Sequence, residues 1–155
     1  MGSFTKDEKR LVEYARADLE ARLKKRRAAG LLDTLVSYAM SESGKIYSGS
    51  PTNFLQVSSC VHAEMMAIGN MRNYEGDFAR VKCILIAGPV PKDDLECTKP
   101  CGICRLFIYE NGTAKTTVIC TCYVRKKSGW DFFPRMEKYL IGRLYPYPYR
   151  DVWRH

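Results

Sequence analysis

The segments His62-Ala63-Glu64 and Pro100-Cys101-Gly102-Ile103-Cys104 are the two stretches of this 155-residue chain that decide its fold and its chemistry. Zinc binds nitrogen and sulfur donors in a tetrahedron, and a catalytic site keeps one of the four positions open for water. Three protein ligands are therefore the expected number, and His62, Cys101 and Cys104 supply three. The two segments predict an open Zn²⁺ site.

The predicted helix over Pro100–Glu110 places both thiols at its N-terminus. Free backbone N–H groups and the positive end of the helix dipole favour the thiolate there, which is the form that binds metal. One imidazole and two thiolates balance the charge of a divalent zinc, and the pKa of a bound water then falls to roughly 7. Glu64 lies too close to His62 in sequence to be an easy fourth ligand. We expect it to take a proton from the water and return it to the leaving group.

Other interpretations of the same residues are open at this point. A C-x-x-C pair also occurs in redox proteins of the thioredoxin type, although here it follows the acidic loop Gly88–Lys99 and not a strand. A structural zinc site would take a fourth thiolate from Cys97 or Cys60. Glu64 by itself could be a first-turn partner of the helix dipole. The two segments together, in this order and each at a predicted helix start, favour the open catalytic site.

The two motifs fit the H-x-E and P-C-x-x-C pattern of zinc-dependent deaminases. The chain resembles the cytidine deaminase superfamily, in particular its cytidine and blasticidin S deaminase branch, from the first helix through Lys45-Ile-Tyr-Ser-Gly49 and both motifs, and weakly to Val152-Trp153. The resemblance implies one domain over residues 1–155, with a three-layer α/β/α fold around a five-stranded mixed sheet. It also implies a homotetramer or dimer that hydrolyses the exocyclic amine of a small aminopyrimidine. The residues that match the family's zinc site and proton shuttle are His62, Cys101, Cys104 and Glu64.

Several positions depart from the family's usual pattern. The branch usually reads Cys-Ala-Glu-Arg with three thiolate ligands, whereas this chain has His62 as the ligand and Met65 in place of the arginine. These two changes compensate each other in charge. The family's ribose-binding Asn and Glu fall on Pro51 and Asn53, and its Gln after Cys-Arg is Leu106. This chain therefore matches the family's zinc site better than it matches the family's ribose-binding residues. The candidate substrate contacts are Asn53, Phe54, which can stack on a heterocycle, and Ala63.

Composition narrows the functional classes. No run of about 18 apolar residues exists. Met1–Arg10 is polar and charged, so neither a transmembrane nor a secreted protein is expected. The chain has 7 cysteines, and this odd number argues against a disulfide framework. We therefore expect a protein of the cytoplasm in which Cys83, Cys120 and Cys122 are small buried hydrophobes.

Basic residues are concentrated at the two ends of the sequence. Residues 1–30 hold 9 basic and 5 acidic residues, residues 125–155 hold 8 and 3, and the formal net charge of the chain is +8. The run Lys24-Lys25-Arg26-Arg27 suits the last turn of a helix, where the dipole favours cations; a phosphate-binding surface is the other interpretation. A deaminase acting on RNA or single-stranded DNA is therefore an alternative function. A non-catalytic zinc-stabilised module is a third, but Glu64 would have no purpose in it.

The rest of the pattern predicts alternating helices and strands. The expected helices are Lys6–Ala29, His62–Tyr74, Pro100–Glu110 and Asp131–Leu140. The expected strands are Thr34–Met40, Lys45–Gly49, Val81–Ala87 ended by Gly88-Pro89, and Thr116–Val124, the first two joined by the turn Ser41–Gly44. This order indicates a mixed sheet with helices on its faces. Pro146 and Pro148 exclude a regular element around them.

Overall fold

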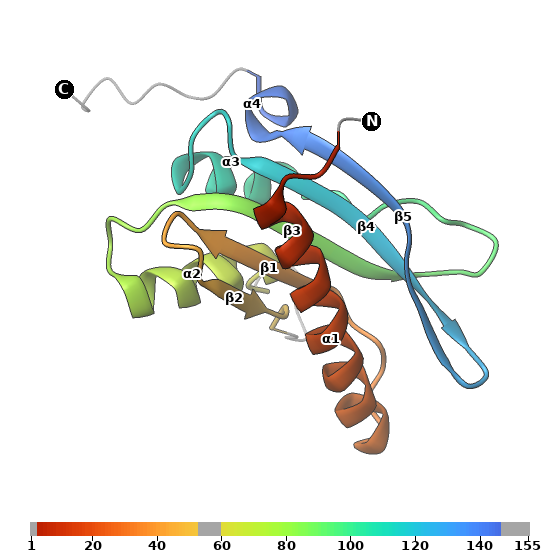
Figure 1. Ribbon diagram of the computed structural model, residues 1–155. Helices are drawn as coiled ribbons and strands as arrows, with labels where there is room; N and C mark the ends of the chain where they lie inside the picture. The colour runs from red at the N-terminus through yellow and green to blue at the C-terminus, as the bar shows by residue number, and fades with distance from the viewer. Residues whose placement is uncertain (1–2, 53–59, 147–155) are drawn as a thin grey trace.

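A five-stranded mixed sheet forms the centre of the molecule, with the strand order β2-β1-β3-β4-β5 (Figure 1). The computed structural model describes residues 3–52 and 60–146. The strands are β1 (Val36–Ser41), β2 (Ile46–Gly49), β3 (Val81–Val90), β4 (Thr117–Lys126) and β5 (Gly129–Leu140). β3 and β4 run parallel, and every other neighbouring pair in this sheet is antiparallel.

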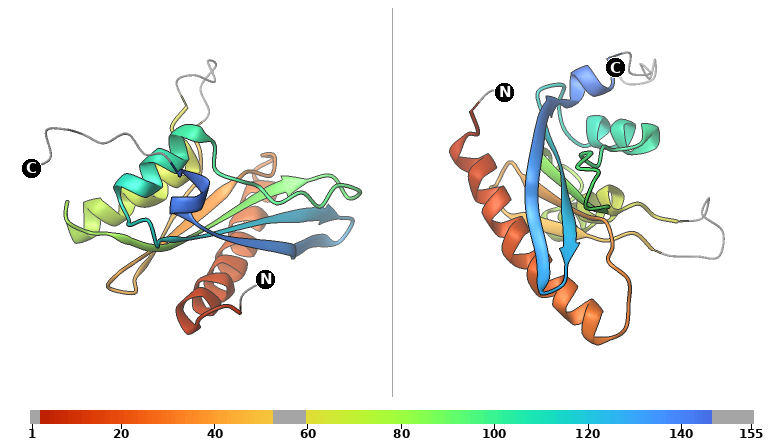
Figure 2. Two further views of the ribbon diagram at one scale, coloured as in Figure 1. Left: turned by 90° about the horizontal axis from the view of Figure 1, so that it is seen from above. Right: turned by 90° about the vertical axis from the view of Figure 1, so that its right-hand side faces the viewer.

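Helices cover both faces of the sheet. α1 (Lys6–Ala28) lies on one face, and α2 (Ala63–Glu75) and α3 (Gly102–Glu110) lie on the other, as the edge-on view in Figure 2 shows. A short helix, α4 (Ile141–Leu144), follows β5. This is the three-layer α/β/α fold that the family resemblance implies. In the part of the chain described, no helix is long and apolar enough to cross a membrane.

The sequence of α1 explains where the helix begins and which face it buries. The Thr5 hydroxyl accepts a hydrogen bond from the Glu8 N–H, and the Glu8 carboxylate accepts one from the Thr5 N–H, which together form a capping box. One face of the helix packs on the sheet through four fully buried residues, Leu11, Ala15, Leu19 and Leu23. The chain leaves the helix through Gly30, whose φ of +70° is a conformation that favours glycine.

A second core lies between the sheet and the helices α2 and α3. Its helical members, all without solvent exposure, are Ala67, Ile68, Met71 and Ile108. They pack on strand residues that point to the same face, among them Ile84, Ile86, Val118 and Cys120. The three cysteines predicted to be buried, Cys83, Cys120 and Cys122, are buried. Because both helices are anchored by this core, their N-terminal ends have fixed positions.

The prediction of a helix over Asp131–Leu140 is wrong, because this segment is most of β5. The two-residue connection Lys127-Ser128 turns the chain back so that it pairs antiparallel with β4. Trp130 and Phe132 then pack against the core on the α1 side of the sheet. Pro134 lies where the register shifts, so its missing N–H costs the ladder little. Pairing and aromatic burial therefore override the local helix-forming composition.

β3 also extends further than predicted. It continues beyond Ala87, through Gly88-Pro89, to Val90. Its pairing with β1 ends at Ala87, whereas its pairing with β4 continues to Val90. Pro89 therefore has a strand on one side only, and its missing N–H does not interrupt a central ladder. The chain from residue 147 onward lies outside the described residues.

Candidate metal centre

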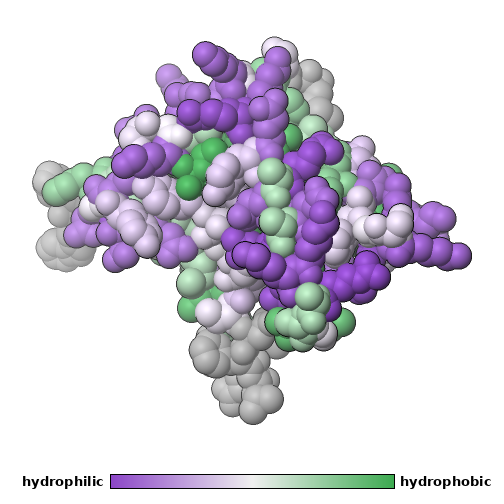
Figure 3. Space-filling model, turned by 60° about the horizontal axis from the view of Figure 1, so that its bottom comes forward, coloured by the Kyte–Doolittle hydropathy of each residue, from purple (hydrophilic) through white to green (hydrophobic). Residues whose placement is uncertain are grey.

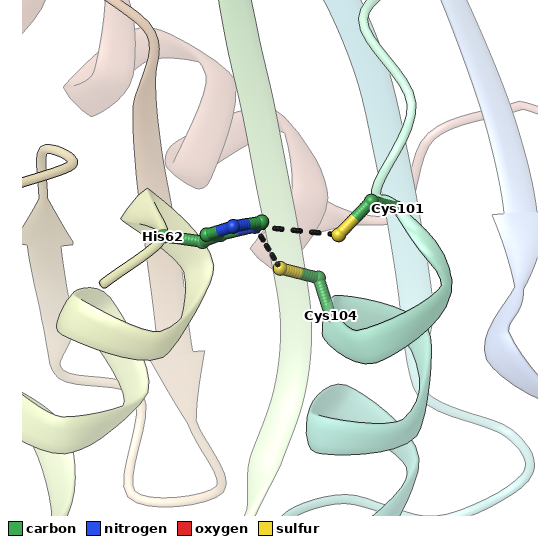
Figure 4. Close-up of side chains that lie close together, drawn as sticks. All are labelled: His62, Cys101 and Cys104. Atoms are coloured by element: carbon green, nitrogen blue, oxygen red, sulfur yellow. Dashed lines mark hydrogen bonds between the residues drawn. The ribbon is translucent and has the colours of Figure 1, made fainter. Parts of the chain in front are cut away.

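Three side chains from two helix starts meet at one point on the α2/α3 side of the sheet (Figure 4). The Nδ1 atom of His62 lies 3.3 Å from the Sγ atom of Cys101 and 3.2 Å from the Sγ atom of Cys104. All three donor atoms lie within 4.8 Å of one another, and the described part of the chain holds no other such group of His, Cys, Asp or Glu. The fold thus brings together the three residues that the sequence selected.

Helix geometry explains how these side chains are presented. His62 is the N-cap of α2 and Cys101 is the N-cap of α3, both with extended backbones, at φ of −73° and −69°. Neither side chain makes a capping hydrogen bond, so each is available to the cluster. Cys104 lies in the first turn of α3 and is fully buried. The N-terminal ends of both helices therefore face the cluster, where their dipoles favour thiolates.

Two glycines allow the backbone around the site to approach the sheet closely. A Cβ atom at Gly49 of β2 would lie 2.5 Å from the carbonyl oxygen of Ala63 and 2.7 Å from the Cβ atom of Met66. A Cβ atom at Gly88 of β3 would overlap the side chain of Thr98, in the loop that leads into α3. The first turn of α2 and this loop are therefore seated directly on the strands.

Hydrogen bonds hold the same loop in place. The Thr98 N–H donates to the carbonyl oxygen of Thr121 in β4 at 3.1 Å. The Arg105 Nε of α3 reaches back to donate to the carbonyl oxygen of Pro100 at 2.9 Å. The position of Cys101 is thus determined from the strand side and from its own helix.

The donor set fits zinc. Zn–N bonds of about 2.0–2.1 Å and Zn–S bonds of about 2.3 Å in a tetrahedron place nitrogen and sulfur ligand atoms about 3.5 Å apart, and the distances found are 3.2 and 3.3 Å. Neither Cys97 nor Cys60 belongs to the group of donors. The Cys97 Sγ instead donates to the carbonyl oxygen of Arg135 at 3.6 Å. Within the described residues, the cluster is therefore a three-ligand site, as a catalytic zinc requires.

Glu64 lies in the first turn of α2, with only 4% of its surface exposed. Burial raises the pKa of its carboxyl group, although hydrogen bonds from its own backbone and from Cys104 act in the opposite direction. Burial also raises the pKa of the Cys104 thiol, and the Glu64 carboxylate beside it raises that pKa further. A buried carboxyl group with a raised pKa gains a proton more readily than an exposed one, which suits a proton shuttle.

A cavity of 240 Å³ opens beside the cluster. Its lining residues are Leu35, Pro51, Cys60, His62, Ala63, Glu64, Lys99 and Cys101. Ala63, which the sequence analysis selects as a substrate contact, therefore lies in the wall of this cavity. Asn53 and Phe54, the other two selected contacts, lie outside the described residues.

Lys99 is the charged lining residue that the sequence does not indicate as part of the site. Its Nζ atom lies 3.2 Å from the Oε2 atom of Glu137 in β5, and the same carboxylate oxygen accepts a hydrogen bond of 2.6 Å from the Tyr139 hydroxyl. The hydrogen bond to Glu137 raises the pKa of Lys99, so the amine stays protonated. In the sequence, only the position of Lys99 directly before Pro100 pointed to the site. Its ion-pair partner Glu137 lies in the segment predicted to be a helix, so the pairing could not be anticipated.

Comparison with known proteins identifies the family to which the chain belongs. The model of the cytidine and deoxycytidylate deaminase zinc-binding region matches residues 20–121, which include both motifs. No match to a curated protein sequence was found.

Several solved structures with the same fold are cytidine deaminases. The enzyme from Burkholderia pseudomallei superposes with a TM-score of 0.66 at 18% identity, covering 94% of this chain and 100% of that one. The enzyme from Bacillus anthracis gives a TM-score of 0.54 at 15% identity and covers 86% of each chain. The enzyme from Mycobacterium tuberculosis gives 0.50 at 14% identity, covering 76% of this chain and 79% of that one. At these identities the likeness concerns the fold.

Proposed function

Because the chain belongs to the family with the cytidine and deoxycytidylate deaminase zinc-binding region, and is therefore a zinc-dependent aminohydrolase, we propose that its substrate is a small aminopyrimidine. The reaction replaces the exocyclic amine of a cytosine-type ring by a carbonyl group and releases ammonia. The observation that carries this proposal is the three-ligand cluster with a buried glutamate and a cavity beside it.

In this proposal each residue at the cluster has one role. His62, Cys101 and Cys104 hold Zn²⁺, which when bound supplies a Lewis acid that lowers the pKa of water to about 7. Glu64 takes the proton of the attacking water and returns it to the amino group as ammonia leaves. Its place in the first turn of α2, two residues after the ligand His62, keeps it beside the reacting atoms without making it a ligand.

The walls of the cavity support a substrate recognised through its ring. Leu35, Pro51 and Ala63 present apolar surface to the cavity. Pro51 has neither a polar side chain nor a backbone N–H, so it cannot donate a hydrogen bond to a sugar hydroxyl. We assign Ala63 to contact with the ring and retain Asn53 and Phe54 as proposed contacts. These walls favour a nucleoside-like substrate that binds mainly through its ring and less through its ribose.

Two alternatives receive less support. A nucleic-acid substrate would require basic residues near the cavity to bind its phosphates. The basic run at the end of α1, however, lies on the opposite face of the sheet from the helices that carry the cluster (Figure 2). A non-catalytic zinc module would have no use for a buried carboxylate beside the metal ligands. Glu64 is such a carboxylate.

The proposal includes a homo-oligomer, a tetramer or a dimer, that acts in the cytoplasm. The resemblance to homotetrameric deaminases motivates the oligomer, and light scattering of the purified protein measures it. None of the 7 cysteines, all of which are among the described residues, forms a disulfide, and this is usual in a reducing compartment.

A panel of aminated heterocycles tests the activity. We expect zinc-loaded protein to release ammonia from at least one of cytosine, cytidine, deoxycytidine and blasticidin S, and the Glu64→Gln variant to release almost none from the same compound. If the zinc-loaded protein releases no ammonia from any member of a broad panel, the proposed activity is wrong.

A further inference from the structure

A groove of 600 Å³ lies between the C-terminal end of α1 and the hairpin that joins β4 to β5. It is on the α1 face of the sheet, whereas the metal-ligand cluster is on the α2/α3 face (Figures 1 and 2). The residues that line it are Glu20, Lys24, Arg27, Ala28, Ser128, Gly129, Trp130 and Phe132. The proposed deaminase activity uses none of them.

Two basic runs that are far apart in the sequence lie at this groove: the first contributes Lys24 and Arg27 to its lining, and the second directly precedes the lining residues Ser128 and Gly129. Lys24-Lys25-Arg26-Arg27 forms the end of α1, and Arg125-Lys126-Lys127 forms the end of β4 and the start of the turn. Arg125 is paired with Trp130 across the hairpin, so both side chains point to the groove side of the sheet. Hydrophilic side chains predominate on the face that Figure 3 turns to the viewer.

Five of these seven cations have no carboxylate partner among the described residues. Lys24 is bound to Glu20 and Lys126 to Asp131, and Arg26 donates to a backbone carbonyl. Apart from Arg26, the cations without an ion pair are Lys25, Arg27, Arg125 and Lys127, and all four are exposed. The helix dipole accounts for basic residues in the last turn of α1, but it does not account for those at the hairpin. Their convergence therefore needs another explanation.

An aromatic pair lies between the two basic runs. Trp130 and Phe132 are stacked, with ring centroids 6.2 Å apart and an interplanar angle of 29°. The Trp130 Nε1–H donates to Asp33 at 3.0 Å, which fixes the orientation of the ring, and the Arg27 guanidinium lies 6.0 Å from the ring centroid. Both aromatic residues are only half-buried. Partly exposed aromatic surface thus lies next to the Arg27 guanidinium and on the same face of the sheet as Arg125.

We infer that this groove binds single-stranded nucleic acid. The four free cations neutralise backbone phosphates, and the indole edge and its stacked partner provide the surface for a base. The bases of a duplex are stacked on one another and could not stack on Trp130, whereas the bases of a single strand can. The groove therefore suits a single strand better than a duplex. The strand would bind on the face opposite the cavity, so it tethers the enzyme to nucleic acid and does not serve as its substrate. The groove shares no lining residue with the cavity beside the metal-ligand cluster, so a failure to bind nucleic acid would not contradict the proposed deaminase activity.

Fluorescence anisotropy with a labelled oligouridylate of about 15 nucleotides tests the inference. Uracil has no exocyclic amine, so the probe cannot be deaminated. Each phosphate contact on a single strand contributes about −0.7 to the slope of log affinity against log salt, so four contacts predict a slope of about −3. Affinity should then fall about 50-fold between 50 and 200 mM salt. A parent protein that does not bind at low salt would overturn the inference.

Matched charge reversals distinguish binding at this groove from a general attraction of the oligonucleotide to the positive charge of the protein. The groove variant is Lys25→Glu/Arg27→Glu/Lys127→Glu, and the control is Lys9→Glu/Lys92→Glu/Lys115→Glu, which changes three exposed lysines elsewhere by the same total charge. We expect the groove variant to lose at least about tenfold in affinity and most of the salt slope, and the control to keep both. Equal losses in the two variants would show a non-specific charge effect and refute the site. Ammonia release by the groove variant should equal that of the parent.

Trp130 gives a readout that does not depend on a destabilising variant. The chain has 2 tryptophans, so Trp153→Phe leaves Trp130 as the only one. Saturating oligouridylate should quench its fluorescence, because a base stacks against or beside the indole. Unchanged emission at saturation would contradict the assignment, as would tighter binding to phosphatidylserine vesicles than to the oligonucleotide.

Discussion

His62 and Cys101, which are 39 residues apart, occupy the same N-cap position in two different helices and bring Nδ1 and Sγ to 3.3 Å from each other. Each backbone is extended at this residue and helical after it, so each side chain leaves the helix start in the direction of the other helix. The site is thus formed by two converging helix N-termini, whose partial positive charges favour the anionic ligands a zinc ion needs.

Removal of both thiols should remove the zinc. We expect the parent to hold about one zinc per chain and the Cys101→Ala/Cys104→Ala variant to hold almost none, because one imidazole alone is too few ligands. Metal analysis after gel filtration measures this. Cys122→Ala is the control, since this buried thiol lies on β4 and donates to the carbonyl oxygen of Leu95. Full zinc occupancy in the double variant would falsify the ligand assignment.

Glu64→Gln should separate metal binding from turnover. The amide keeps the size of the side chain but cannot carry the proton, so turnover should fall by about 10²–10⁴-fold or more while zinc content is unchanged. Because Glu64 is buried and its pKa is raised, the neutral amide should not destabilise the fold. Parallel measurements of zinc content, Tm and ammonia release decide this. A variant that deaminates as fast as the parent, or that loses its zinc, would contradict the shuttle role.

Cytidine should be a poor substrate relative to another aminopyrimidine. Pro51 lines the cavity at the position where a ribose-binding side chain is expected, and it offers no hydrogen bond. Sites built to hydrogen-bond a substrate group discriminate by several orders of magnitude, about 10⁴–10⁵-fold at best. The Pro51→Asn/Asn53→Glu variant should therefore raise kcat/KM for cytidine but not for cytosine, which has no ribose. Either cytidine as the best substrate of the panel, or unchanged cytidine kinetics in a folded, zinc-loaded double variant, would refute this.

Gly49→Ala should destabilise the site from the strand side. The added methyl group would lie 2.5 Å from the carbonyl oxygen of Ala63, so α2 must move, at a cost of about 1–3 kcal/mol. We expect a lower Tm and weaker zinc retention against a chelator. Gly69→Ala is the matched control, because a Cβ atom there meets nothing within 4 Å and alanine is the better helix former by about 1 kcal/mol. A Gly49→Ala variant as stable as the parent would show that the close approach is not tight.

Glu8 should make stability depend on acid pH. Burial alone would raise the pKa of Glu8, but hydrogen bonds from Lys138 at 2.7 Å and from Thr5 outweigh it and lower the pKa below the ordinary value of 4.5. The unfolded chain therefore takes up this proton first as the pH falls, so the stabilisation is present above about pH 4.5 and is lost as the pH falls through the folded-state pKa. Glu8→Gln should cost more free energy of unfolding at pH 7 than at pH 3 in urea titrations. Glu13→Gln, at an exposed position of the same helix, should show no such difference.

Much of the architecture follows from local sequence. The helices α1, α2 and α3 begin and end within about two residues of their predicted limits, because their caps and their buried positions lie within the segments themselves. The three ligand candidates and Glu64 were selected for the same kind of reason, since zinc restricts the donors and the motifs hold those donors at helix starts. The fifth strand was expected only from the family resemblance.

The tertiary structure decided what depends on residues distant in the sequence. Asp131–Leu140 has helix-forming residues, yet it is a strand, because pairing with β4 and burial of Trp130 and Phe132 outweigh a weak local propensity. Lys99 and its partner Glu137 meet only because β5 forms. The two basic runs become one surface only when the hairpin lies beside the end of α1. Ligand chemistry and helix caps act over a few neighbouring residues, whereas strand pairing and surface charge depend on distances that exist only after folding.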